Sequence, residues 1–154
     1  MTELSGNPDE PVTTRIVVRW DDVDPNLHLR HTCYGTYAAQ ARLALFKSVG
    51  VNITLGQELR VSPILFTENL AYRREVGFDD EVTITAAVSA LRRDGSRFSI
   101  HHEVLRPDGQ LAATVDVTGA WIDLASRKLA APDQQVADLL WSLPRTDDFT
   151  ELSA

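Results

Sequence analysis

Four side chains that could act in acid–base or nucleophilic chemistry lie within one short polar stretch of the sequence. They are Asp22, Asp24, His28 and His31. Directly after them, from about Thr32, apolar residues recur at the spacing of an α-helix that we expect to end near Val49. A helix N-terminus presents unpaired backbone amides, and these stabilise negative charge. The sequence therefore predicts a carboxylate-bearing loop delivered to a helix tip, which suits reactions that develop an oxyanion.

Asp24 is the leading candidate for the reacting carboxylate. It could attack a carbonyl carbon or activate a water molecule, whereas its alternative reading is a turn-forming aspartate before Pro25. We expect Asp22 to be mainly structural. If the preceding strand continued, however, Asp22 would face the same side as Asp24, and both could reach one pocket. Cys33 could be a nucleophile, because thiols at helix N-termini are acidified, but a lone cysteine early in an apolar helix is more often a core residue.

The two loop histidines leave several roles open. His28 and His31 could polarise a substrate carbonyl, orient a water molecule, or bond to backbone groups in a tight loop. A metal site is not expected from the four loop side chains, because their spacing matches no specific metal signature.

The elements that position this loop are predicted from hydrophobic periodicity and turn residues. We expect strands over residues 13–20, 64–76, 82–88, 97–105 and 111–124, the long helix near 32–49, and a short helix over 133–141. Asp94-Gly95 and Asp108-Gly109 indicate tight turns between consecutive strands. This order predicts an α+β domain in which one helix is buried against an antiparallel sheet. Such a sheet leaves an edge and an apolar face to protect, so we expect dimerisation.

The overall composition restricts the class of protein. A length of 154 residues with 44% hydrophobic residues fits one globular domain, expected over residues 13–142 between tails at 1–12 and 143–154. The net charge of −7 argues against general nucleic-acid binding. No apolar run approaches the length of about 18 residues needed to span a membrane. The single cysteine and the polar N-terminus without an apolar run favour a cytoplasmic protein.

A family resemblance rests on the loop and the start of the helix. Asp22-Val23-Asp24-Pro25, then His28-Leu29 and Tyr34, match an Asp-x-Asp loop, a Gly-His-Val-Asn-Asn-like stretch and a helix tyrosine. They resemble the hotdog-fold acyl-CoA thioesterases of the 4-hydroxybenzoyl-CoA thioesterase-like group. Further similarity extends over about residues 13–140, through Tyr37, Ala41-Arg42, the turn at 79–82, the Arg92-Arg93 hairpin and the last long strand. The resemblance implies a hotdog fold, with a five-stranded antiparallel sheet wrapped around one long central helix.

The resemblance also implies roles for individual residues. Asp24 would be the nucleophile or general base, with His28 and His31 beside it and amides of residues 31–33 as the oxyanion hole. An acyl channel between subunits would be lined by Tyr34, Tyr37, Leu65 and Phe66. The phosphates of coenzyme A would bind to Arg92, Arg93, Ser96 and Arg97. The substrate would be a thioester of coenzyme A or acyl carrier protein, the assembly a homodimer or homotetramer, and no metal or further cofactor would be needed.

The sequence departs from the family pattern at three places. Leu27 replaces the frequent glycine before the histidine, Arg30-His31 replaces an Asn-Asn pair, and Gln40 replaces a helix glutamate. Arg30 could pair with the loop aspartates or bind an anionic acyl end. These departures leave open a non-catalytic acyl-thioester-binding protein. A hotdog hydratase or dehydratase is a further alternative, but the helix from residue 33 to 49 contains no Asp or Glu to serve as its acid.

Overall fold

Six strands form one sheet in the computed structural model of the chain, which describes residues 9–154. The strands are β1 (Val12–Val17), β2 (Val61–Tyr72), β3 (Glu81–Arg92), β4 (Arg97–Leu105), β5 (Leu111–Asp123) and β6 (Arg145–Leu152). Their order is β1-β3-β4-β5-β2, all antiparallel, and β6 pairs with β3 in parallel. The sheet and its central helix confirm the predicted α+β hotdog architecture, with six strands in place of five.

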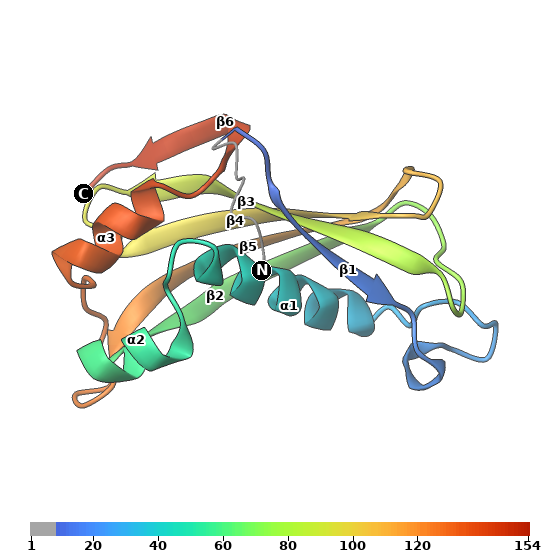
Figure 1. Cartoon of the computed structure of the whole chain (residues 1–154), viewed down its shortest axis with the longest axis horizontal. Helices are drawn as coiled ribbons and strands as arrows, with labels where there is room; N and C mark the ends of the chain where they lie inside the picture. The colour runs from blue at the N-terminus through green and yellow to red at the C-terminus, as the bar shows by residue number, and fades with distance from the viewer. Residues whose placement is uncertain (1–8) are drawn as a thin grey trace.

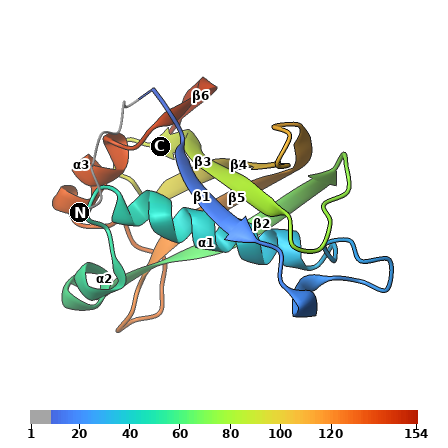
Figure 2. The same cartoon turned by 45° about the vertical axis from the view of Figure 1, so that its right-hand side comes forward.

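The long helix α1 (Cys33–Lys47) lies along one face of the sheet (Figure 1; Figure 2). Ala38, Ala41 and Leu45 have no exposed surface. The small side chains of the two alanines let the helix approach the strands closely. The chain turns away after the helix at Gly50, whose φ of +85° lies in the left-handed region that glycine adopts without strain. Thr32 precedes the helix with helical dihedrals, and its side chain forms no capping bond.

The core lies between α1 and the inward side chains of the strands. β4 alternates strictly between buried and partly exposed residues, so its inward residues face the helix. At one end, the rings of Phe46, Phe98 and Trp121 pack edge to face with centroids 5.9–6.3 Å apart. Gly95 and Gly109 have φ of +75° and +82°, so both Asp-Gly pairs form the predicted hairpin turns.

The C-terminal segment corrects the prediction of a tail over residues 143–154. Helix α3 (Gln134–Trp141) is followed by β6, which extends the sheet beside β3 (Figure 1). Arg93 holds β6 through two bonds to the Glu151 carboxylate at 2.9 and 2.7 Å, and Trp141 packs edge to face with Phe149. The segment carries too few apolar residues to read as a strand, and its pairing depends on these distant side chains.

The other predicted boundaries differ by a few residues. The first strand ends at Val17, and a 3-10 turn, η1 (Trp20–Asp22), follows. A short helix, α2 (Ile53–Leu59), occupies the connection before β2. Of the predicted N-terminal tail, residues 1–8 lie outside the described residues, whereas Val12 already belongs to β1.

His102 is a titratable group buried in the core, with no exposed surface. Its Nδ1 lies 2.9 Å from the Thr85 carbonyl oxygen, which can only accept, so Nδ1 carries the proton. Its Nε2 then accepts from Arg42 Nη1 at 3.2 Å. Burial, and secondarily the charge of Arg42, lower the pKa of His102 to about 4.

This lowered pKa predicts that stability falls on acidification. Between the ordinary histidine pKa of 6.5 and about 4, the unfolded chain binds a proton that the folded chain does not. We expect His102 to contribute a loss of about 2 kcal/mol in unfolding free energy between pH 7.5 and pH 5. Urea unfolding of the wild type and of His102→Gln at both pH values measures this loss of unfolding free energy. An equal pH dependence in the two proteins would contradict the prediction.

Candidate active site

The loop before α1 is organised around Asp24. One carboxylate oxygen, Oδ1, accepts from the backbone amides of Asn26 at 2.9 Å and His28 at 3.2 Å. These are the contacts of a turn-forming aspartate. Within residues 9–154 the other oxygen, Oδ2, forms no hydrogen bond. Asp24 therefore shapes the loop with one oxygen and leaves the second available to a substrate or a water molecule.

His28 pairs with a residue that the sequence did not indicate. Its Nε2 lies 3.2 Å from Glu75 Oε2, in the connection between β2 and β3. The contact follows from backbone bridges, because Leu29 N donates to the Val76 carbonyl at 2.7 Å and His28 pairs with Gly77. No local pattern reveals this glutamate, since the pairing joins segments far apart in the sequence.

Asp22 occupies the more enclosed part of the loop. Its Oδ2 accepts from the Tyr37 hydroxyl at 2.7 Å, and Arg19 Nε lies 3.5 Å away. Burial, and then the bond to Asp22, raise the pKa of Tyr37, so this phenol stays protonated. Cys33 Sγ lies 3.8 Å from Asp22 Oδ1. Burial, followed by the Asp22 charge, raises the pKa of Cys33, which weakens the alternative of a thiolate nucleophile.

The tip of α1 offers free amides beside this loop. Cys33 N, one of the three amides that the resemblance implied for the oxyanion hole, donates to the Arg30 carbonyl at 2.9 Å and is therefore not available. In the described part of the chain, the next two amides, of Tyr34 and Gly35, form no bond to a loop or side chain, as expected in the first turn of a helix. Glu68 of β2 packs over this turn, and a Cβ placed on Gly35 would lie 2.7 Å from its Oε1. Sequence reasoning missed this second carboxylate as well.

Tyr34 links the helix tip to the loop. Its ring packs edge to face on Tyr72 at 5.3 Å, and the Tyr72 hydroxyl donates to the His31 carbonyl at 3.2 Å. Burial raises the pKa of the Tyr34 phenol, and the neighbouring groups that raise it further are Tyr72, Glu75 and Asp24. The charges of Asp24 and Glu75 thus act in the same direction as burial and keep the Tyr34 phenol protonated.

Leu27 keeps a left-handed backbone, with φ of +62°, where the resembling family has glycine. For a residue with a Cβ this conformation costs about 1–2 kcal/mol. It is held because Leu27 N donates to the Asp24 carbonyl and the Leu27 carbonyl accepts from Phe78 N, both at 2.9 Å. The loop geometry is thus maintained against a local cost, as is common at functional sites.

The remaining residues that the sequence assigned to substrate contacts are spread over a longer path. Arg30 does not pair with the loop aspartates; its Nη2 donates to the carbonyls of Asp21 and Val23 at 3.2 Å. His31, which the resemblance implied as a catalytic neighbour of Asp24, has an exposed side chain. Leu65 and Phe66 lie exposed on β2, the edge strand. Of the four predicted lining residues, only Leu65 borders an apolar cavity between α1 and β2.

That cavity, of about 220 Å³, adjoins a second one of about 260 Å³ beneath α2. Both are bordered by Leu43, Phe46 and Pro63. The first begins at Ala39, six residues after Cys33, which corresponds to about 9 Å along the helix. The apolar groove therefore runs along α1 from near the loop towards α2.

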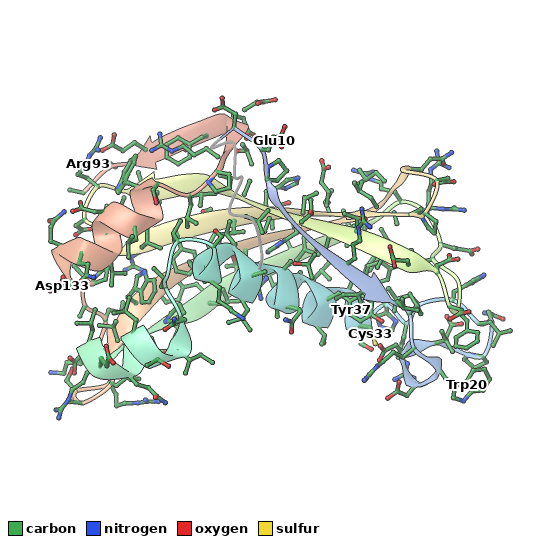
Figure 3. All side chains as sticks on the ribbon, viewed as in Figure 1. Glu10, Trp20, Cys33, Tyr37, Arg93 and Asp133 are labelled. Atoms are coloured by element: carbon green, nitrogen blue, oxygen red, sulfur yellow. The ribbon has the colours of Figure 1, made fainter. Side chains whose placement is uncertain are left out.

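The predicted coenzyme A hairpin lies at the opposite end of the fold from the loop (Figure 3). Arg93 is bonded to Glu151 and stacks on Trp141, with the guanidinium carbon 4.2 Å from the ring centroid. Arg92 donates to the Ser153 carbonyl at 3.1 Å and to Ser96 Oγ at 3.4 Å. Arg97 lies over Phe66 at 4.8 Å. The structure thus brings Asp24 and His28 together in the loop that precedes Tyr34 and α1, and it leaves these four residues apart from that loop.

Sequence comparison assigns the chain to a family. Residues 18–140 match the pattern of the thioesterase-like superfamily. The chain belongs to this superfamily. The match ends before β6, so the C-terminal strand lies outside the family pattern. None of the curated proteins compared with the sequence is significantly similar to it.

Solved structures of thioesterase-like proteins share the fold of this family member. A hypothetical protein of Staphylococcus aureus, solved in complex with CoA, has a TM-score of 0.79 at 20% identity over 90% of this chain and 89% of that one. The DHNA-CoA thioesterase of the same organism has a TM-score of 0.76 at 20% identity, over 84% of this chain and 86% of that one. The probable thioesterase YbaW of Escherichia coli has a TM-score of 0.74 at 21% identity, over 87% of this chain and 99% of that one.

Two further observations concern the described residues. No three of their His, Cys, Asp or Glu side chains come together in a way that could hold a metal ion. None of the helices within residues 9–154 is long and apolar enough to cross a membrane.

Proposed function

We propose that this protein is an acyl-CoA thioesterase that hydrolyses its substrate at the tip of α1. The observation that carries the proposal is that one loop-and-helix segment holds two groups suited to thioester hydrolysis. One is the Asp24 carboxylate with its free Oδ2. The other is the pair of unbonded amides of Tyr34 and Gly35. Membership of the thioesterase-like superfamily supports the same chemistry.

In the proposed reaction, the thioester carbonyl oxygen accepts bonds from the α1 amides, and Asp24 acts on the carbonyl carbon. As a nucleophile, Asp24 forms a mixed anhydride while the carbon–sulfur bond breaks, and water then hydrolyses the anhydride. As a general base, it takes a proton from the attacking water. The leaving sulfur takes up a proton in either case. His28, oriented by Glu75 at 3.2 Å, is suited to donate it. The amides stabilise the tetrahedral oxyanion in both routes.

The acyl chain is proposed to lie in the groove along α1. The groove is lined mainly by apolar side chains and starts near the loop. Its outer wall is the edge strand β2, whose Leu65 and Phe66 are exposed in the single chain. An open edge with large apolar side chains is protected when a second copy packs against it. We therefore propose a homodimer joined along β2.

Hydrolysis of a panel of acyl-CoA thioesters, followed through release of the free thiol, tests the proposal. We expect turnover with at least one acyl group and saturation of the rate with substrate. Binding of coenzyme A without turnover of any acyl thioester would instead identify a non-catalytic acyl-thioester-binding protein.

A further inference from the structure

Two arginines that the proposed reaction does not use follow β2 directly. Arg73 and Arg74 are exposed, and they stand immediately before Glu75, the partner of His28. Their backbone amides both bond to the Ala112 carbonyl, at 2.7 and 3.0 Å, so the sheet fixes their backbone. Within residues 9–154 neither guanidinium lies in an ion pair or a side-chain hydrogen bond. Two unneutralised cations therefore border the candidate site.

An exposed tryptophan packs against the same connection between β2 and β3. Trp20 is 68% exposed, although large aromatic side chains are usually buried. Its ring contacts Phe78 edge to face at 5.4 Å, and Phe78 N donates to the Leu27 carbonyl of the site loop. Figure 3 places Trp20 at the same end of the molecule as Cys33 and Tyr37. The connection that carries Arg73 and Arg74 therefore also contacts an open aromatic ring, through Phe78.

We infer that the nucleotide half of coenzyme A binds on this surface, with Arg73 and Arg74 holding its phosphates and Trp20 stacking on its adenine. The inference rests on the proposed function, because it assigns the non-reacting part of the same substrate. Guanidinium forks match phosphate oxygens, and bases stack on open aromatic rings. The pantetheine arm separates the phosphates from the thioester, so the phosphates should be held by exposed cations outside the reaction site, as Arg73 and Arg74 are.

The other arginine pair is less free to bind phosphate. Arg93 would have to release its two bonds to Glu151. A carrier protein is also a poorer occupant of this surface than coenzyme A. A carrier protein would cover a wider area, and that area includes the exposed carboxylates of Asp21 and Asp79. The net charge of this chain is −7. Coenzyme A needs only the local cations and the ring.

Calorimetric titration with coenzyme A tests the inference without requiring turnover. We expect the Kd for coenzyme A to rise about tenfold or more in Arg73→Gln/Arg74→Gln. Arg15→Gln removes an exposed arginine of β1 and should leave the Kd as in the wild type. Coenzyme A should also quench the tryptophan fluorescence, and Trp20→Phe should abolish that quenching.

Hydrolysis of an acyl thioester of N-acetylcysteamine, which lacks the nucleotide, separates this inference from the proposed function. The double variant should keep the wild-type KM for that substrate while its KM for acyl-CoA rises. The inference is overturned if the wild type does not bind coenzyme A, or if the double variant binds it as tightly. It is equally overturned if only Arg92→Gln/Arg93→Gln weakens binding. Wild-type binding that needs Arg73 and Arg74, without hydrolysis of either thioester, would instead overturn the proposed function alone.

Discussion

Replacing Asp24 with asparagine is expected to lower kcat for acyl-CoA hydrolysis by about two to four orders of magnitude. The amide has no basic or nucleophilic oxygen comparable to the carboxylate. It still has a carbonyl oxygen that can accept from the amides of Asn26 and His28, so the loop should keep its shape. Steady-state kinetics with thiol detection measures the change.

Asp21→Asn provides the matched control for this substitution. Asp21 lies in the same segment, and among residues 9–154 its carboxylate makes only an exposed pair with Arg19 at 3.3 Å. Such pairs contribute little, so kcat should stay at the wild-type value. Wild-type turnover by Asp24→Asn would remove the carboxylate from the mechanism and leave it only the turn-forming role.

The second large effect is expected at the His28–Glu75 pair. His28→Gln should lower kcat by about two orders of magnitude, because the proton donor for the leaving sulfur is lost. Glu75→Gln should have a smaller effect, since Glu75 acts only by orienting the imidazole. The double variant should be no slower than His28→Gln alone, because the two residues act as one unit.

A stability measurement separates this catalytic coupling from damage to the fold. Exposed ion pairs contribute about 0–1 kcal/mol, and Glu75 is 74% exposed, so Glu75→Gln should unfold at nearly the wild-type urea concentration. Additive losses of kcat in the double variant would show that the histidine and the glutamate act independently, contrary to the proposed roles.

Much of the fold follows from local patterns in the sequence. The apolar spacing after Thr32 predicts α1, and the two Asp-Gly pairs predict the hairpins that carry Gly95 and Gly109. β4 matches its predicted range of 97–105, because its period of two is uninterrupted and both flanking turns are clear. These features depend on neighbours in the chain, so one sequence is sufficient to find them.

The features that sequence reasoning missed depend on distant contacts. Glu75 reaches His28 only because Leu29 and Val76 are bonded across the sheet end. β6 depends on Arg93 of the turn between β3 and β4 and on Trp141 of α3. Gln40 stands where the resembling family has a helix glutamate. Nothing in the sequence, however, indicates that Glu68 packs over Gly35 from β2. A residue type and its spacing do not reveal such a partner.

The most direct test of the central claim is a crystal structure with a non-hydrolysable acyl-CoA analogue, in which a methylene replaces the thioester sulfur. We predict that its carbonyl oxygen lies about 2.7–3.1 Å from the amides of Tyr34 or Gly35, with the free oxygen of Asp24 facing the carbonyl carbon. A bound analogue whose carbonyl lies away from the tip of α1, with Asp24 directed into solvent, would contradict the account.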